Sequence, residues 1–195
     1  MKTVFLAVIL VFLLPQPCLL ALDVGGTVDP GVRSITMENT DGRRVSIDAV
    51  RGKKGTLVVF SCNHCPWAKA WEGRIAAIGA EYVKKDVGVI MVNSNDPEEY
   101  PTDGISHMKK KKFAFPYVVD QGSKVAKAFG AKRTPEIFLL SPDNRVVYHG
   151  AVDDNSEDPA QVKKTYLRDA LAALVSGRKI PVQETRSIGC SIKFY

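Results

Sequence analysis

Cys62 and Cys65 are the residues whose types and spacing point most clearly to chemistry. Two cysteines separated by two residues can close a small disulfide, and each thiolate is a nucleophile. The pair directly follows residues 56–60, an apolar run typical of a buried parallel strand, and precedes a segment with helical periodicity. Unpaired N–H groups and the helix dipole favour a thiolate at a helix N-terminus. We therefore predict that Cys62 is the nucleophile, with a lowered pKa, and that Cys65 attacks the resulting mixed disulfide and releases the product.

His64 lies between the two cysteines and is predicted to tune Cys62. Its imidazole can add positive charge or a hydrogen bond to the Cys62 thiolate. Either contact stabilises the dithiol form and makes the disulfide more oxidising than one flanked by neutral residues. Pro66, directly after the pair, suits the first turn of a helix because its missing N–H costs little there.

A structural disulfide or half of a zinc site would use the same cysteine spacing. A zinc site of the usual kind needs a second close pair of Cys or His, whereas His107, His149 and Cys190 are scattered along the chain. The position directly after a buried strand favours redox chemistry over both alternatives. The sequence therefore predicts no metal site and no cofactor.

The elements that must position the pair are indicated by hydrophobic periodicity and turn signals. The first two strands form a hairpin, and strands then alternate with helices until a late hairpin. This order predicts an α/β fold with a central mixed sheet and helices on both faces, and the pair lies where a central strand ends and a helix begins. Strands are predicted at residues 34–37, 43–47, 56–60, 87–92, 117–119, 136–140 and 145–149, and helices at residues 64–85, 104–112, 123–129 and 159–175.

The beginning of the chain reads as a secretory signal at residues 1–21. Lys2 precedes an unbroken apolar run at residues 4–14, and two prolines follow the run. We expect an exported protein, either periplasmic or secreted. An uncleaved N-terminal anchor is the alternative, and a lipoprotein attached through Cys18 is the weaker one.

The composition excludes several classes of protein. With 195 residues, 45% apolar and 25% charged, the chain suits one globular domain rather than a disordered, collagen-like or disulfide-dense protein. We predict a domain at residues 22–176 and a tail at residues 177–195. Cys190 in this tail could resolve a disulfide, pair with a partner or pack on the domain as a small hydrophobe, and we assign it no catalytic role. The formal net charge of +6, or +5 without Lys2, identifies no partner. The basic run at residues 109–112 lacks the aromatic residues of a nucleic-acid site, so no nucleic acid is expected.

The strand before the pair, the motif from Cys62 to Pro66, and Thr134-Pro135 ahead of a later strand resemble the thioredoxin superfamily. The chain is similar over most of its length to the exported branch with the alkyl-hydroperoxide-reductase/thiol-specific-antioxidant type of domain, which includes TlpA-like and ResA-like proteins. The resemblance implies a thioredoxin-like fold with a strand–helix unit inserted at about residues 96–120. It also implies that Pro135 follows a cis peptide bond and faces the pair, and that the backbone of Thr134 binds a substrate peptide.

Several positions depart from the pattern of this family. Thr56 stands where plain thioredoxin has a buried acid, a candidate proton acceptor for the second thiol, so water or another group must take that proton. Ser61 replaces the tryptophan usually found before the pair. Trp67 and Trp71 follow the pair and are predicted to pack in the helix rather than to contact substrate, and Glu136 is predicted to be exposed.

The favoured hypothesis is an enzyme that exchanges disulfides with protein thiols and disulfides through Cys62 and Cys65. We expect a monomer that receives electrons from a membrane or soluble donor. The predicted effect of His64 favours an oxidant, whereas the resemblance to ResA-like and TlpA-like proteins favours a reductase. One alternative is a thiol peroxidase in which Cys65 is the peroxidatic cysteine. Such a cysteine needs Thr or Ser three positions before it, and this chain has Cys62 there. The other is a Cu(I) carrier that uses both cysteines and a histidine such as His149.

Overall fold

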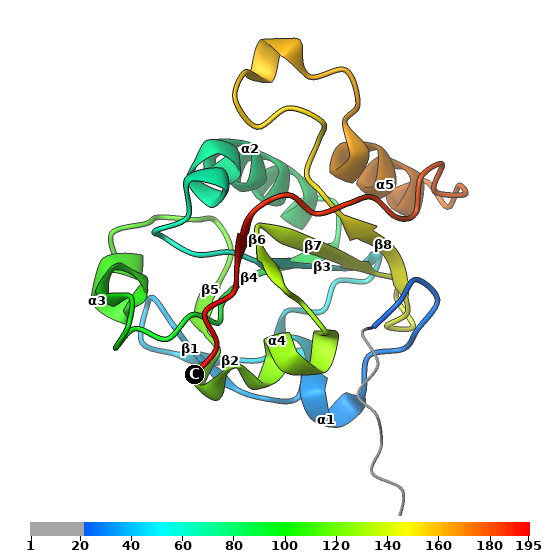
Figure 1. Ribbon diagram of the computed structural model, residues 1–195. Helices are drawn as coiled ribbons and strands as arrows, with labels where there is room; N and C mark the ends of the chain where they lie inside the picture. Colours follow the sequence, from blue (N-terminus) through cyan, green and yellow to red (C-terminus); the bar gives the residue numbers. More distant parts are fainter. Residues whose placement is uncertain (1–21) are drawn as a thin grey trace, which may run out of the picture.

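The computed structural model of the protein describes residues 22–195, so the predicted signal at residues 1–21 lies outside the described residues (Figure 1). The strands are β1 (Met37–Asn39), β2 (Arg44–Val45), β3 (Gly55–Phe60), β4 (Val87–Asn93), β5 (Tyr117–Val119), β6 (Arg133–Thr134), β7 (Glu136–Leu140), β8 (Val146–Gly150) and β9 (Cys190–Ser191). The α-helices are α1 (Pro30–Arg33), α2 (Pro66–Val83), α3 (Ile105–Met108), α4 (Lys124–Phe129) and α5 (Tyr166–Val175). Short 3₁₀ helices occupy Asp48–Val50, Pro101–Asp103, Gln121–Ser123 and Pro159–Gln161.

A seven-stranded mixed sheet runs in the order β2-β1-β5-β4-β3-β7-β8. β3 and β5 pair in parallel with β4, and the other neighbours are antiparallel. All six residues of β3 are buried, as expected of a strand covered on both faces. The predicted α/β architecture, with an N-terminal hairpin formed by β1 and β2, is confirmed.

Helices cover both faces of the sheet (Figure 1). α2 and α5 pack on one face, where Trp71 and Leu171 join one buried apolar cluster. α4 packs on the other face, where the ring of Phe129 lies edge-on against Phe60 and Phe138, with centroids 5.5 and 5.2 Å away. Because β3 contributes side chains to both clusters, its C-terminal end provides a rigid base for the residues that follow it.

The helix predicted at residues 104–112 is shorter in the structure and ends at Met108. Lys110 and Lys111 donate their backbone N–H groups to carbonyls three residues back, at 3.1 and 2.9 Å, which is the tighter spacing of a 3₁₀ turn. The inserted unit therefore consists mainly of irregular chain around α3.

The helix predicted at residues 159–175 is also shorter, because α5 begins only at Tyr166. Before it, the backbone N–H groups of Lys163 and Lys164 donate to the Asp154 carboxylate, at 2.9 and 3.1 Å, instead of to helical carbonyls. Among residues 22–195, no helix combines the length and the apolar character needed to cross a membrane.

The C-terminal tail returns to the domain instead of leaving it (Figure 1). Ile180 and Ile192 are buried, and β9 pairs antiparallel with β6, so that Cys190 lies opposite Thr134. The tail therefore lies beside the segment that leads into Pro135 and β7.

Candidate active site

Cys62 and Cys65 lie in the short connection between β3 and α2. α2 begins at Pro66, so Cys65 is the N-cap residue of this helix, and Cys62 lies three residues earlier. Proline suits the first helical position because its φ is already helical and its missing N–H would be unpaired there. The helix N-terminus therefore supports Cys65 directly, which corrects the placement of Cys62 at the start of the helix.

Thr134 lies against both sulfur atoms. Its hydroxyl oxygen is 3.2 Å from Cys62 Sγ, and its carbonyl oxygen accepts a hydrogen bond from the Cys65 thiol at 3.1 Å. The peptide bond between Thr134 and Pro135 is cis, as the family resemblance implied. Cys62 and Cys65 are only 2% and 0% exposed, so the sulfur pair is enclosed.

The two thiols ionise as a pair. A hydrogen bond with the Cys62 thiol is the largest cause that lowers the pKa of Cys65 to about 4, and the same hydrogen bond, followed by burial, raises the pKa of Cys62. The backbone N–H of Ala68, in the first turn of α2, lowers the pKa of Cys65 further. The pair therefore gives up its first proton more easily than an ordinary thiol and holds the second more tightly.

Thr134 and α2 place the remaining proton on different sulfurs. A carbonyl oxygen can only accept, so the contact with Thr134 keeps the proton on Cys65, while the Thr134 hydroxyl can donate to a Cys62 thiolate. The Ala68 N–H instead favours a Cys65 thiolate. Either sulfur can thus become the thiolate, depending on which of these contacts is made.

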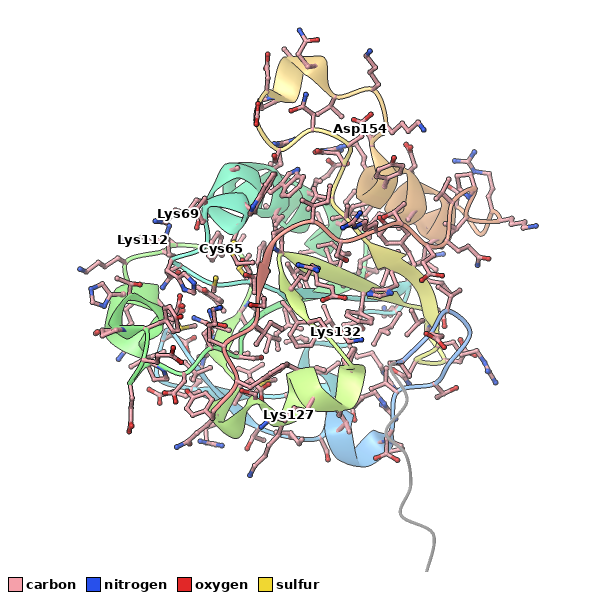
Figure 2. All side chains as sticks on the ribbon, viewed as in Figure 1. Cys65, Lys69, Lys112, Lys127, Lys132 and Asp154 are labelled. Carbon is pink, nitrogen blue, oxygen red and sulfur yellow. The ribbon has the colours of Figure 1, made fainter. Side chains whose placement is uncertain are left out.

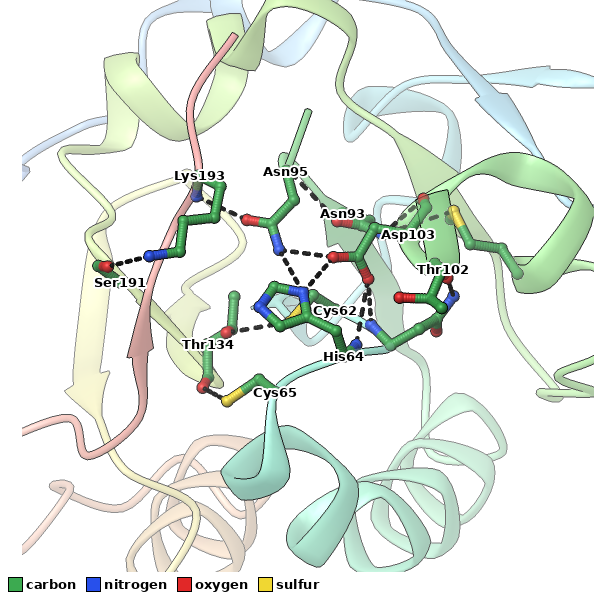
Figure 3. A network of polar contacts seen from close by, with 12 residues as sticks. Cys62, His64, Cys65, Asn93, Asn95, Thr102, Asp103, Thr134, Ser191 and Lys193 are labelled. Atoms are coloured by element: carbon green, nitrogen blue, oxygen red, sulfur yellow. Dashed lines mark hydrogen bonds and ion pairs between the residues drawn. The ribbon is translucent and has the colours of Figure 1, made fainter. Parts of the chain in front are cut away.

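Asp103 is a buried carboxylate beside Cys62 (Figure 3). It is 1% exposed, and it accepts hydrogen bonds from the backbone N–H of Asn63 and from Nδ1 of His64, both at 2.5 Å. The His64 ring also stacks on Tyr100, with centroids 4.5 Å apart. Asp103 and Tyr100 therefore hold the ring, and its Nδ1 is bonded to Asp103 rather than to the Cys62 sulfur.

Sequence reasoning did not identify Asp103. The residue ends the 3₁₀ helix Pro101–Asp103 in the inserted unit, and no spacing motif marks it within a loop rich in Asn, Asp and Pro. Its negative charge is one of the causes that raise the pKa of Cys62, after the hydrogen bond with Cys65 and burial. Asp103 therefore opposes the effect that was predicted for a positive His64.

Asn95 connects this network to the C-terminal tail (Figure 3). Its side-chain nitrogen donates to Asp103 at 2.9 Å, and its side-chain oxygen accepts from the backbone N–H of Lys193 at 2.7 Å. The backbone N–H of Asp96 donates to the Lys193 carbonyl at 2.7 Å. The tail is thus attached both to β6 and to the loop after β4.

Cys190 packs against the pair. It contacts the cluster formed by Cys62, Cys65 and Ala68 and is only partly buried, and all three cysteines are free thiols. Figure 2 places Cys65 between the start of α2 and the tail strand. Burial, followed by a hydrogen bond with Cys65, raises the pKa of Cys190 to about 11. The predicted packing of Cys190 on the domain is confirmed, and its neighbours are the redox cysteines.

Cys62, His64 and Asp103 could together hold a metal ion, since one ligand atom of each lies within 4.8 Å of the others. The hydrogen bonds described above already satisfy both oxygens of Asp103 without an ion. His149, the histidine considered for Cu(I), is engaged elsewhere, because its Nε2 lies 2.7 Å from Glu136 Oε1. The structure therefore does not bring His149 to the cysteine pair.

Glu136 is buried, so the prediction that it is exposed is wrong. One oxygen of its carboxylate accepts the backbone N–H groups of Lys132 and Arg133, at 2.7 and 2.8 Å, and the other contacts His149. Glu136 thereby fixes the chain just before Thr134 and supports the segment that contacts the thiols.

The two tryptophans of α2 differ. Trp71 is buried and its indole N–H donates to Asp153 at 2.7 Å, so its predicted packing is confirmed. Trp67 is 38% exposed, and its ring stacks on Trp71 with centroids 6.2 Å apart, so it packs on the helix surface rather than in the core. Thr56 is buried, and among residues 22–195 its hydroxyl finds no hydrogen-bond partner.

Comparisons with known proteins agree with this geometry. The sequence model of the Redoxin family matches residues 25–166. The thiol-disulfide oxidoreductase ResA of Halalkalibacterium halodurans is 25% identical over 114 residues, which are 58% of this chain and 62% of that protein, less than two thirds of its length.

Two solved structures are similar over nearly the whole chain. An uncharacterized conserved protein from Geobacillus kaustophilus superposes with a TM-score of 0.82 and 34% identity, over 89% of this chain and 93% of that one. A hypothetical protein from Sinorhizobium meliloti 1021 superposes with a TM-score of 0.80 and 27% identity, over 90% of this chain and 96% of that one. The predicted thioredoxin-like α/β fold is confirmed.

Proposed function

The chain belongs to the Redoxin family and is a thiol oxidoreductase, and we propose that it reduces disulfides in protein substrates outside the cytosol. One observation carries this proposal. The cysteine pair follows the central strand β3, and the sulfurs of Cys62 and Cys65 both contact Thr134. Export rests on the apolar run at residues 4–14. Electrons come from a dithiol donor, either soluble or held at a membrane.

The contacts of Thr134 suggest the order of the steps. The Cys62 thiolate, with the Thr134 hydroxyl as a donor, attacks one sulfur of a substrate disulfide and forms a mixed disulfide, while the other substrate sulfur leaves as a thiolate. Cys65 then loses its proton, with the α2 N-terminus stabilising its thiolate, and attacks Cys62 Sγ. The Cys62–Cys65 disulfide forms, and the substrate leaves as a dithiol.

Asp103 supports the direction of reduction. A negative charge near Cys62 destabilises its thiolate, and therefore the reduced form of the pair, which makes the dithiol a stronger reductant. His64 alone favours the opposite direction, but its ring is bonded to this carboxylate. The geometry thus agrees with the reductase branch of the sequence-based hypothesis.

Reduction of insulin disulfides, with Cys62→Ser and Cys65→Ser variants, tests the proposal. We expect Cys62→Ser to reduce no insulin above background, because it lacks the attacking thiolate. Cys65→Ser should accumulate a mixed disulfide with insulin, visible as an adduct in intact mass spectra, because nothing resolves it. Wild-type protein with alkylated thiols is the control for non-specific reduction. Equal adduct formation by both variants would contradict the assigned roles.

Peroxide reduction is the outcome that would replace this proposal. We expect the reduced protein to react with hydrogen peroxide no faster than a free thiol does, measured by stopped-flow tryptophan fluorescence. A rate far above that of a free thiol, together with inactivity towards insulin, would identify a thiol peroxidase.

A further inference from the structure

The tail strand β9 is held directly against the residue that contacts both sulfurs. Cys190 pairs with Thr134 and Ser191 with Arg133, and the Arg133 guanidinium donates to the Gly189 carbonyl at 3.0 Å. The approach at Gly189 is so close that a Cβ atom there would lie 2.1 Å from the Thr134 carbonyl oxygen. The position of Cys190 is therefore set by the backbone pairing of β9 with β6 and, on the other side, by the contact of the Arg133 side chain with Gly189.

This pairing gathers three thiols: Cys62, Cys65 and Cys190, the three-thiol cluster. Cys190 packs against Cys62 and Cys65 and lies opposite Thr134, whose carbonyl oxygen accepts the hydrogen bond from the Cys65 thiol at 3.1 Å. Cys62 and Cys65 are enclosed, whereas Cys190 is partly exposed. Within the described part of the chain, Cys190 is thus the member of the cluster nearest to solvent.

We propose that Cys190 is a third redox thiol, which takes over the disulfide from the Cys62–Cys65 pair as a Cys65–Cys190 disulfide. The Cys190 thiolate attacks Cys65 Sγ, the Cys65–Cys190 bond forms, and the Cys62–Cys65 bond breaks. Cys62 leaves as a thiolate and takes up the proton that Cys190 released. The number of disulfides is unchanged, so this step needs no external oxidant or reductant.

The ionisation of Cys190 changes in the direction that this exchange requires. In the reduced protein, burial raises the pKa of Cys190, and its hydrogen bond and charge interaction with Cys65 raise it further. Once Cys65 enters a disulfide, it carries no negative charge, and this contribution is lost. Cys190 therefore becomes a better nucleophile when the pair has been oxidised.

The exchange brings the disulfide towards solvent. A thiolate of the reductant attacks the partly exposed Cys190 Sγ and releases Cys65 as a thiolate, and a second reductant thiol then frees Cys190. The two electrons come from the two reductant thiols, which end as a disulfide. This role rests on the proposed function only for the origin of the first disulfide, so the exchange can be tested without a substrate.

The experiment maps the disulfides of the full chain after oxidation with diamide. Cys18, outside the described residues, is replaced by Ser in every variant, so that three thiols remain. The variants are Cys62→Ser, Cys65→Ser and the parent with all three thiols. Each is quenched in acid, alkylated, digested without reduction and analysed by mass spectrometry, and circular dichroism verifies folding.

We expect most of the Cys62→Ser protein to carry a Cys65–Cys190 disulfide, with a loss of 2 Da in intact mass, since two hydrogen atoms (two protons and two electrons) pass to diamide. Cys65→Ser should form at least ten-fold less intramolecular disulfide, because Cys65 is the cysteine that contacts the Thr134 backbone, with which Cys190 is paired. The parent should contain the Cys65–Cys190 disulfide beside the Cys62–Cys65 disulfide. Absence of the Cys65–Cys190 disulfide from either protein, or equal yields in the two Ser variants, would overturn the proposal.

A Gly189→Ala variant in the Cys62→Ser background supplies an independent measurement. The new Cβ cannot fit against the Thr134 carbonyl, so β9 must move away from β6. We expect the yield of the Cys65–Cys190 disulfide to fall several-fold while the circular dichroism of the domain is retained. An unchanged yield would show that the pairing of β9 does not position Cys190 for exchange. Loss of insulin reduction with intact disulfide exchange would refute only the proposed function.

Discussion

Replacing Asp103 with Asn should make the cysteine pair more oxidising. Asp103 is 1% exposed, and one oxygen of its carboxylate lies within 4.8 Å of Cys62 Sγ. Asn keeps the size of the side chain and one acceptor oxygen but removes the negative charge. The change therefore acts mainly on the energy of the Cys62 thiolate and on the orientation of His64.

The size of the effect follows from Coulomb's law. A full charge 4.8 Å away, at an effective dielectric constant of about 20, raises the energy of the Cys62 thiolate by about 3.5 kcal/mol. A share of the negative charge on Cys65, or a positive His64 ring, reduces this energy, so we expect a remainder of roughly 1.4 to 3.5 kcal/mol. For a two-electron couple, this remainder corresponds to a rise in reduction potential of about 30 to 75 mV.

The assay is equilibration of the pair with glutathione redox buffers at pH 7, with the oxidised fraction measured by alkylation and mass spectrometry. Asp153→Asn is the matched control, since Asp153 is also buried but binds Trp71 and Arg74 instead of a cysteine. Both variants should lose stability to urea, at about 1.5 to 3 kcal/mol for each hydrogen bond to the charged group, but only Asp103→Asn should change the potential. An unchanged or lower potential in folded Asp103→Asn would refute the reasoning.

The remaining predictions concern ionisation and packing. Because the pKa of Cys65 is lowered to about 4 by the hydrogen bond with Cys62, the reduced pair carries one proton near neutral pH, and the potential should fall by about 30 mV per pH unit between pH 5 and 8. The same lowered pKa of Cys65 also stabilises the reduced fold relative to Cys65→Ala, most strongly above the ordinary thiol pKa. In urea unfolding, the difference in free energy of unfolding between the two proteins should vanish as the pH falls to 4. A difference that stays constant with pH would contradict the lowered pKa. On α2, Gly79→Ala should cost about 1 to 3 kcal/mol, since its Cβ would lie 2.2 Å from the Phe115 ring. Gly73→Ala, with open space around it, should instead gain about 0.5 to 1 kcal/mol in the same urea titration, and equal effects of the two would be inconsistent with the packing.

The base of the site could be predicted from local sequence alone. The run at residues 56–60 is typical of a buried strand because it is short, β-branched and almost wholly apolar, and Pro66 marks the start of the following helix. Thr134-Pro135 before an apolar run was enough, through the family resemblance, to predict the cis bond. These elements are local patterns, and each carries its own signal.

The groups that surround the sulfurs could not be predicted, because they arrive from distant segments of irregular chain. Asp103 lies in a 3₁₀ turn of the insertion, where no periodicity fixes its neighbours. Glu136 was judged from its strand-start position, but it satisfies two backbone N–H groups that the turn before Pro135 leaves unpaired. Sequence spacing predicts elements better than it predicts which buried donors need an acceptor.

The pairing of Cys190 with Thr134 also brings together distant segments of the chain, and it affects how a substrate reaches Cys62. The β6–β9 ladder is two residue pairs long, whereas β3 is held by full ladders on both sides within the seven-stranded sheet. Short ladders at a sheet edge or in a tail open at a smaller free energy than the global unfolding of the domain. Because Cys62 and Cys65 are enclosed and Cys190 packs against them, a protein disulfide can reach Cys62 only after local opening. The β6–β9 ladder holds Cys190 opposite Thr134, so we expect its opening to separate Cys190 from the pair and to uncover the edge of Thr134 for a substrate.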